Sequence, residues 1–335
     1  MNYTDLITDI TSNIKPNGHR EITGQVLQDV LLNMADYFEM EKNKAKPLAF
    51  TCVQNGLFKL QYSSFAINNS FTADLEYSKN GAPFQAYTMG TGISCDVGDI
   101  VELKGNNARL TVLDSSNYRP AFNWAGFGGR WKLSGNLLSL VSKDNFMNIT
   151  ALVAHQFDYL FSRYGTSDSE FYQLKDASEL ILPEFTANFC YLSMFSRCSS
   201  LEKAPKLPAM VLSERCYGNM FERCTNLQEI PELPATTLAT DCYYGMFENC
   251  TTITKAVLPA PMYEAGCYAR MFYSCSHLNE IECHFTTGPG NENMNTNNWV
   301  YGVASTGTFK KVAGSTWPSG VKGIPNNWTE VEMES

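Results

Sequence analysis

A short motif recurs four times in the second half of the chain, with the pattern Cys-Tyr-x-x-Met-Phe-x-x-Cys-x-x-Leu. The copies begin at Cys190, Cys216, Cys242 and Cys267, so their starts lie 26, 26 and 25 residues apart, and Ile253 replaces the final leucine in the third copy. A regular period of this length is typical of repeat proteins, in which each unit is one supersecondary element that leans on the next. The repeats therefore predict a solenoid, an architecture that presents surface and seldom performs chemistry.

The spacing inside one unit predicts its local structure. Cys216, Met220 and Cys224 are four residues apart, which predicts a short helix with one apolar face. Residues 226–230 predict a short strand, and the prolines in 231–235 predict an irregular return. Because one unit cannot bury its apolar face alone, at least about three must stack. The expected buried ladder consists of Cys190, Met194, Phe195, Cys198, Leu201, Cys216, Met220, Phe221, Cys224, Leu227, Cys242, Met246, Phe247, Cys250, Cys267, Met271, Phe272, Cys275 and Leu278.

The chain has 11 cysteines, which raises the alternatives of disulfide bonds or a zinc site. The spacing of the two cysteines within one copy fits no usual zinc motif. An odd total also leaves one thiol unpaired in any fully oxidised scheme. Free cysteine packs as a small hydrophobe, so we expect buried thiols, no bound metal and no cofactor. Free thiols favour folding in a reducing cytoplasm.

The N-terminal residues 1–46 predict a helical hairpin. Apolar residues recur three and four apart from Tyr3 to Ile14, and a Lys-Pro-Asn-Gly segment then ends the first helix. A second helix begins near Thr23 and carries its own apolar stripe. The hairpin either packs on its own chain or anchors the protein by oligomerising or docking on a larger assembly. For the anchor, the candidate assembly contacts are Leu27, Val30, Leu31 and Met34.

Between residues 47 and 147 the apolar period changes to two, which predicts strands. Asn80-Gly81 is a strong signal for a tight hairpin turn. Closely spaced short strands suggest one antiparallel β-sandwich. The predicted strands cover 49–53, 57–62, 71–77, 100–104 and 108–112.

Together these patterns predict a multidomain α+β chain. A degenerate copy of the repeat at 160–164 marks the expected start of the solenoid. A terminal repeat is expected to differ from the others because it lacks a neighbour on one face. The expected parts are a helical attachment or oligomerisation segment (1–46), an antiparallel β-sandwich (47–147), a repeat solenoid with a period of about 26 (148–287) and a C-terminal cap (288–335).

Composition and motifs argue against several function classes. The net charge is −9 and no cluster of lysine or arginine is present, so we expect no nucleic-acid partner. No stretch approaches the ~18 apolar residues of a membrane span, so we expect no membrane insertion. The four histidines belong to no catalytic motif, and we expect no enzyme activity. Asp96 and Asp99 lie in a turn-like segment, and residues 124–131 are more typical of a bulged strand than of a sugar site.

The repeats, with their Leu-Pro-Ala returns, resemble the BspA-type leucine-rich repeats of gut Bacteroidales and of the bacteriophages that infect them. The segments 75–81 and 98–107 are similar to the β-domain that often precedes such repeats, and 299–329 is similar to the usual end of these arrays. The opening segment 15–27 is similar to the N-termini of phage fibre and appendage proteins.

This resemblance implies a leucine-rich-repeat fold and one of two settings. The family divides between exported bacterial adhesins and virion proteins, and the chain begins without a visible export signal. We therefore expect a phage structural protein, a tail or head fibre or appendage, that is assembled in the host cytoplasm. Its expected partners are other virion proteins, which it would contact through the N-terminal helices, further copies of itself, and a host-surface glycan or protein bound without catalysis. The alternatives are a BspA-type adhesin on the bacterial cell surface and a fibre-borne polysaccharide depolymerase.

Overall fold

The computed structural model describes residues 31–32, 34, 38, 42–114, 117–124, 129–162, 173–259, 264–285 and 295–334. The chain divides into two compact units, Met1–Lys46 and Pro47–Ser335. Within the described residues, no helix is both long and apolar enough to cross a bilayer.

The α+β fold class predicted from the sequence is wrong. The described part of the chain is mainly β, and its helices after residue 47 are α3 (Ser64–Asn68) and two short 3-10 helices, η1 (Leu137–Leu140) and η2 (Phe146–Asn148). Residues 31–32, 34, 38 and 42–44 of the first unit are helical, but the described residues include no helical hairpin, and most of the predicted hairpin lies outside them. An apolar stripe stabilises a helix only where a partner buries it, yet Leu31 and Leu32 are each 55% exposed.

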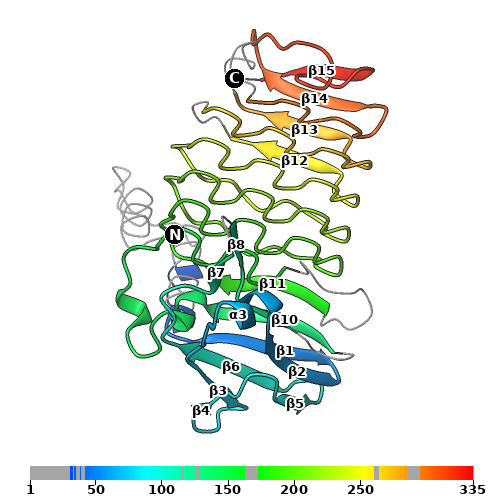
Figure 1. The fold of residues 1–335 in the computed structure, drawn as a ribbon. Helices are drawn as coiled ribbons and strands as arrows, with labels where there is room; N and C mark the ends of the chain where they lie inside the picture. Colours follow the sequence, from blue (N-terminus) through cyan, green and yellow to red (C-terminus); the bar gives the residue numbers. More distant parts are fainter. Residues whose placement is uncertain are drawn as a thin grey trace, which may run out of the picture. The chain divides into compact units, whose positions relative to one another are not determined.

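The N-terminal part of the second unit is built around a six-stranded sheet (Figure 1). Side chains alternate across it as the period of two predicts: in β10, Trp131 and Leu133 are buried, whereas Arg130 and Lys132 face outward. The strand order is β11 (Gln173–Ile181), β10 (Arg130–Asn136), β1 (Leu48–Gln54), β6 (Ile100–Gly105), β3 (Leu75–Lys79) and β4 (Gln85–Ala86).

This sheet is not the purely antiparallel structure expected from the sequence. β11 pairs with β10 in parallel, although β11 comes from the segment predicted to begin the repeats. The tight turn at Asn80-Gly81 is confirmed, because φ is 54° at Asn80 and 75° at Gly81. Smaller sheets complete this region, namely β5 (Gly92–Cys95), β2 (Gly56–Tyr62) and β9 (Phe122–Trp124), and the pair β7 (Thr111–Asp114) and β8 (Asn117–Pro120).

Aromatic side chains join the sheets to the first turns of the repeat region. The ring of Phe50 lies 5.1 Å from that of Phe58 and 4.7 Å from that of Trp124. The Trp124 ring in turn lies 5.2 Å from Phe161. Phe161 precedes the first full repeat, so one continuous core runs from the sheets into the repeats.

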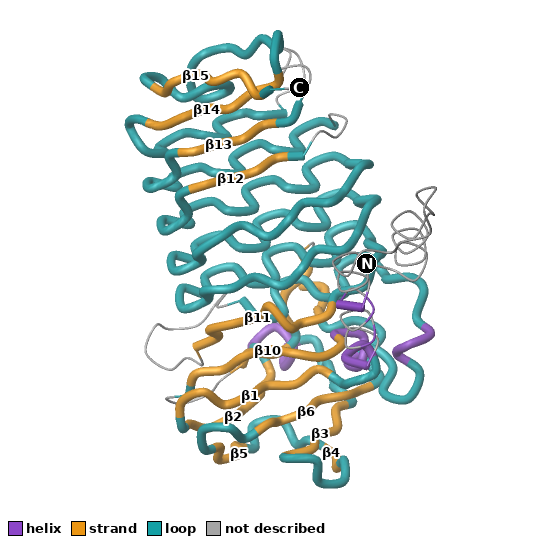
Figure 2. The backbone as a smooth tube through the Cα atoms, turned by 180° about the vertical axis from the view of Figure 1, so that it is seen from behind, coloured by secondary structure: helices purple, strands orange, loops and turns teal. Residues whose placement is uncertain are grey.

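The repeats form coils that stack in chain order after β11 (Figure 1). Three copies of the motif precede β12 (Lys255–Leu258) and the fourth follows it, and Figure 2 shows most of this stretch as loop. We call the described residues between 155 and 302 the coil stack. Within each motif the backbone N–H groups alternate in direction. Leu192 and Met194 donate to carbonyls three residues earlier, whereas Tyr191 and Ser193 donate to Cys216 and Gly218 in the next coil. Every second N–H group therefore ties one coil to the next.

The prediction of a helix inside each repeat is wrong, because this alternating hydrogen-bond pattern is not that of a helix. An α-helix bonds each N–H to the carbonyl four residues earlier and keeps φ negative throughout. Within each motif every fourth residue instead has a positive φ, so each motif is a series of tight turns. A four-residue turn period and a helix both place apolar residues four apart. The positive-φ residues of the four copies are Phe189, Ser193, Arg197, Arg215, Asn219, Arg223, Asp241, Gly245, Asn249, Gly266, Arg270 and Ser274.

The prediction that every unit contributes a strand is also wrong, so the regular leucine-rich-repeat solenoid is not found. The first two copies have Pro205 and Pro231 where the last two have Val257 and Glu282. Proline cannot donate to a ladder, and only the copies without it form strands. The resulting parallel sheet contains β12, β13 (Glu280–Cys283), β14 (Gly307–Val312) and β15 (Trp328–Met333).

Candidate functional site

The ladder residues predicted from the sequence all lie in the interior of the coil stack, each at most 4% exposed. Their aromatic rings stack from coil to coil. The Phe221 ring lies 5.5 Å from Phe195 and 5.7 Å from Phe247, with interplanar angles of 6° and 5°. A second column runs through Tyr191, Tyr217, Tyr243 and Tyr268. These residues hold the coils in register and cannot touch a partner.

The second cysteine of each copy has a specific structural role. The Cys224 thiol donates a hydrogen bond of 3.2 Å to the carbonyl oxygen of Phe195, one coil earlier, and Cys250 and Cys275 repeat the contact at 3.0 Å. All eleven cysteines are free and buried. Burial raises the pKa of Cys275 to about 12, so this thiol stays protonated and keeps its donor. A small apolar side chain with one weak donor fits this position.

The partly buried His155 pairs with the buried carboxylate of Asp158, with 2.5 Å between Nδ1 and Oδ2. The His155 ring is stacked between Tyr118 and Phe189, with centroids 4.0 and 4.6 Å away. Burial raises the pKa of Asp158 to about 6, although the hydrogen bond to His155 opposes the shift. Both faces of the imidazole are covered, so the pair closes the first coil and has no room for a substrate.

Other sequence candidates for chemistry are also structural. Trp124 and Trp131 are 4% and 0% exposed, so neither lines a sugar site. Asp99 accepts hydrogen bonds from the backbone N–H of Asp96 and from Asn80, and it pairs with Lys79 at 2.7 Å. Across the described ranges, no group of three or more histidine, cysteine or acidic side chains is placed to hold a metal ion.

The candidate assembly contacts lie in the first unit. Leu27 and Val30 are outside the described residues. Leu31 is helical and 55% exposed, and Met34 is helical and half-buried.

The outer face of the coil stack carries a row of tyrosine and arginine side chains. We call Arg215, Tyr244, Arg270, Tyr273 and Tyr301 the tyrosine–arginine strip. The Arg270 guanidinium lies 4.0 Å from the centroid of the Tyr273 ring, and the Tyr273 and Tyr301 rings stack at 4.9 Å. The guanidinium of Arg215 lies 5.4 Å from the Tyr244 ring. The strip therefore spans four successive coils.

Acidic side chains of neighbouring coils hold the two guanidinium groups. Arg270 binds the Glu248 carboxylate through Nε at 2.9 Å and Nη2 at 2.6 Å. Arg215 contacts Asp241 at 2.8 Å. The hydrogen bond from Arg270 and its proximity to Glu248 raise the pKa of Arg270 above its ordinary value. The strip is thus preorganised, and Tyr301, 49% exposed, presents its ring to solvent.

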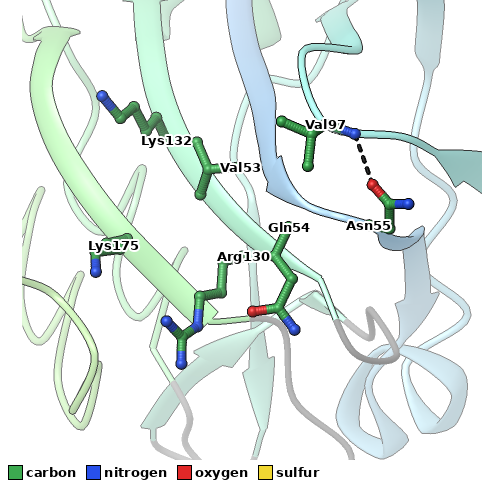
Figure 3. Close-up of a pocket in the computed structure, with 7 residues that line it drawn as sticks. All are labelled: Val53, Gln54, Asn55, Val97, Arg130, Lys132 and Lys175. Carbon is green, nitrogen blue, oxygen red and sulfur yellow. Dashed lines mark hydrogen bonds between the residues drawn. The ribbon is translucent and has the colours of Figure 1, made fainter.

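A second surface feature, which the sequence did not predict, is an open pocket on the outward face of the six-stranded sheet (Figure 3). Three of its seven lining residues are cationic: Arg130 and Lys132 on β10, and Lys175 on β11. The alternation of outward residues in β10 was a sequence signal that could have predicted Arg130 and Lys132. No sequence signal predicted the position of Lys175, because it depends on an irregular pairing between distant strands.

Comparison of the chain with protein-family models, with curated proteins and with solved structures found no match.

Proposed function

We propose that this protein is a non-catalytic recognition protein, a phage virion fibre or appendage, in which the outer face of the coil stack binds a glycan or protein on the host surface. The first unit, 1–46, attaches it to other virion proteins. The resemblance of the repeats supports the virion setting, and the geometry of the coil stack supports binding.

One observation carries the binding proposal. The inward positions of each copy are nearly identical, whereas the outward positions of the same turns differ. The residue before the second cysteine, for example, is Arg197, Arg223, Asn249 and Ser274 in the four copies, and none of these four is buried. Constant inward residues fix the spacing of the coils, and the outward residues are free to form a specific surface. Here they form a strip of tyrosine and arginine, the residue types that dominate the energetics of binding interfaces.

Copy number strengthens such a surface. An appendage present in several copies binds a dense host surface through many weak contacts, and linked sites raise avidity by ~10²–10⁴ without any new contact. Modest affinity at one strip is therefore sufficient for attachment.

Binding of purified protein to host cells tests the proposal. Tyr301→Ser removes an exposed ring with little effect on the core, and we expect about tenfold weaker binding, the equivalent of about 1.4 kcal/mol. Lys206→Ala, an exposed residue on the proline-containing return, is the matched control and should bind normally. Unchanged binding by Tyr301→Ser and by Arg270→Gln would refute the strip as the binding surface.

Two further measurements test the setting and the absence of catalysis. Mass spectrometry of purified phage particles should find the protein as a stoichiometric component. Detection of the protein on bacterial envelopes instead would identify it as an adhesin. Incubation with host polysaccharide should release no reducing ends. New reducing ends would identify a depolymerase.

A further inference from the structure

The pocket on the six-stranded sheet has a volume of about 590 Å³. This falls in the range of ~300–1,000 Å³ that is typical of ligand pockets. Figure 3 shows its side chains arranged across three neighbouring strands and the loop that contains Val97. It is lined by Val53, Gln54, Asn55, Val97, Arg130, Lys132 and Lys175.

Two β-bulges shape this pocket. The pairing of β1 with β10 skips from Cys52 to Gln54, so Val53 is an extra residue on β1. The pairing of β10 with β11 leaves Lys175 unpaired between Leu174 and Asp176. Bulges of this kind redirect side chains and are common beside functional sites. Here they flank Arg130 and Lys132 on both sides.

The charge of the lining is entirely positive, because none of the seven residues is acidic. Lys175 has a carboxylate partner outside the lining, Glu202 at 2.9 Å, and Lys132 lies 3.7 Å from Asp176. Arg130 contacts a neutral group, since its Nε donates a 2.9 Å hydrogen bond to the side-chain oxygen of Gln173. The remaining guanidinium N–H groups can therefore form the paired hydrogen bonds that arginine makes with a carboxylate or phosphate.

The rest of the lining suits a polar ligand. Asn55 is held in place because its Oδ1 accepts a 2.8 Å hydrogen bond from the backbone N–H of Val97 (Figure 3). Gln54 adds a second amide. Amide side chains can hydrogen-bond hydroxyl groups as donor and as acceptor, which matches a saccharide.

The charge of the whole chain limits the size of the anion. At a net charge of −9 the surroundings repel a long polyanion such as nucleic acid. A ligand that carries isolated negative groups between neutral, hydroxylated segments avoids this repulsion. We infer that the pocket binds an acidic saccharide, whose carboxylate or phosphate group is held by Arg130 between Lys132 and Lys175.

This site is separate from the tyrosine–arginine strip and does not depend on the proposed function. Isothermal titration of the full chain with trigalacturonate at low salt tests it. We expect saturable binding, at least tenfold weaker in Arg130→Gln and weaker in Lys132→Gln, both exposed positions. Lys206→Gln and Tyr301→Ser should bind normally, and added salt should weaken binding through screening.

Competing ligands decide the chemical class. A neutral trisaccharide should not bind, and inorganic phosphate and polyglutamate should bind at least tenfold more weakly than trigalacturonate or a phosphorylated trisaccharide. A lack of saturable binding to either acidic saccharide would overturn the inference, as would equal binding of the neutral sugar or full affinity in Arg130→Gln. If polyglutamate bound most tightly, the pocket would be an acidic peptide site. If phosphate bound as tightly as the saccharides, it would be a simple anion site. Either result would also overturn the inference of an acidic-saccharide site.

Discussion

Glycine substitution at Arg223 distinguishes tandem turns from a helix, because the two structures predict effects of opposite sign. Arg223 lies at the outer end of a motif, has a φ of 59° and donates its backbone N–H to the Glu248 carbonyl at 2.7 Å. Its side chain is 53% exposed, and its ion pair among the described residues is with the adjacent Glu222, at 3.2 Å. Arg223→Ala and Arg223→Gly lose this pair equally, so their difference reports the backbone alone.

The expected difference follows from the backbone conformation. The left-handed region destabilises a residue with a side chain by about 1–2 kcal/mol and hardly affects glycine. The greater conformational entropy of glycine in the unfolded chain lowers the stability of the glycine variant by about 0.4–1 kcal/mol relative to alanine. We therefore expect Arg223→Gly to be more stable than Arg223→Ala by about 1 kcal/mol. In a helix, glycine would instead be less stable by about 1 kcal/mol.

Urea unfolding followed by circular dichroism measures this difference, and thermal unfolding should show Arg223→Gly melting about 2–4 °C above Arg223→Ala. The matched control is Glu229, which is exposed and has an ordinary negative φ, so that alanine should be at least as stable as glycine there. If alanine is the more stable residue at both positions, the tandem-turn description of the coil stack is wrong.

Three further outcomes follow from the structure. Phe221→Ala leaves a cavity between two stacked rings and should lower the free energy of unfolding, measured by urea titration, by about 3–5 kcal/mol. A decrease in this free energy of less than about 1 kcal/mol would contradict a rigidly packed ladder. Iodoacetamide should label no cysteine in the folded protein and all 11 after denaturation, by mass spectrometry, because every thiol is buried; rapid labelling of Cys216, whose pKa burial raises to about 12, would contradict this. Hydrogen bonds from Lys79, Asn80 and the Asp96 backbone lower the pKa of Asp99 from 3.8 to about 2. Its ionised form therefore stabilises the fold above about pH 4, and this contribution is lost as the pH falls toward 2. The stability gap between the native chain and Asp99→Asn should narrow over that range, and a constant gap would refute the assignment.

The sequence by itself determined which residues are buried in the repeats and where one unit ends. Cys216, Met220 and Phe221 recur at a fixed period because each must meet its equivalent in the next coil, and a regular period leaves few other ways to cover the apolar residues. The alternating strands β1, β2 and β6 and the Asn80-Gly81 turn were equally readable, since these patterns depend on local geometry.

Only the tertiary structure decided what the repeats look like. The four-residue spacing is common to a helix and to a series of tight turns, and the choice between them depends on hydrogen bonds to the next coil, such as Tyr191 to Cys216, that no local pattern reveals. The binding surfaces were hidden for a similar reason. Arg215, Tyr244 and Tyr301 come from different coils. Arg130 meets Lys175 only because β10 and β11, separated by more than thirty residues, pair in parallel with a bulge.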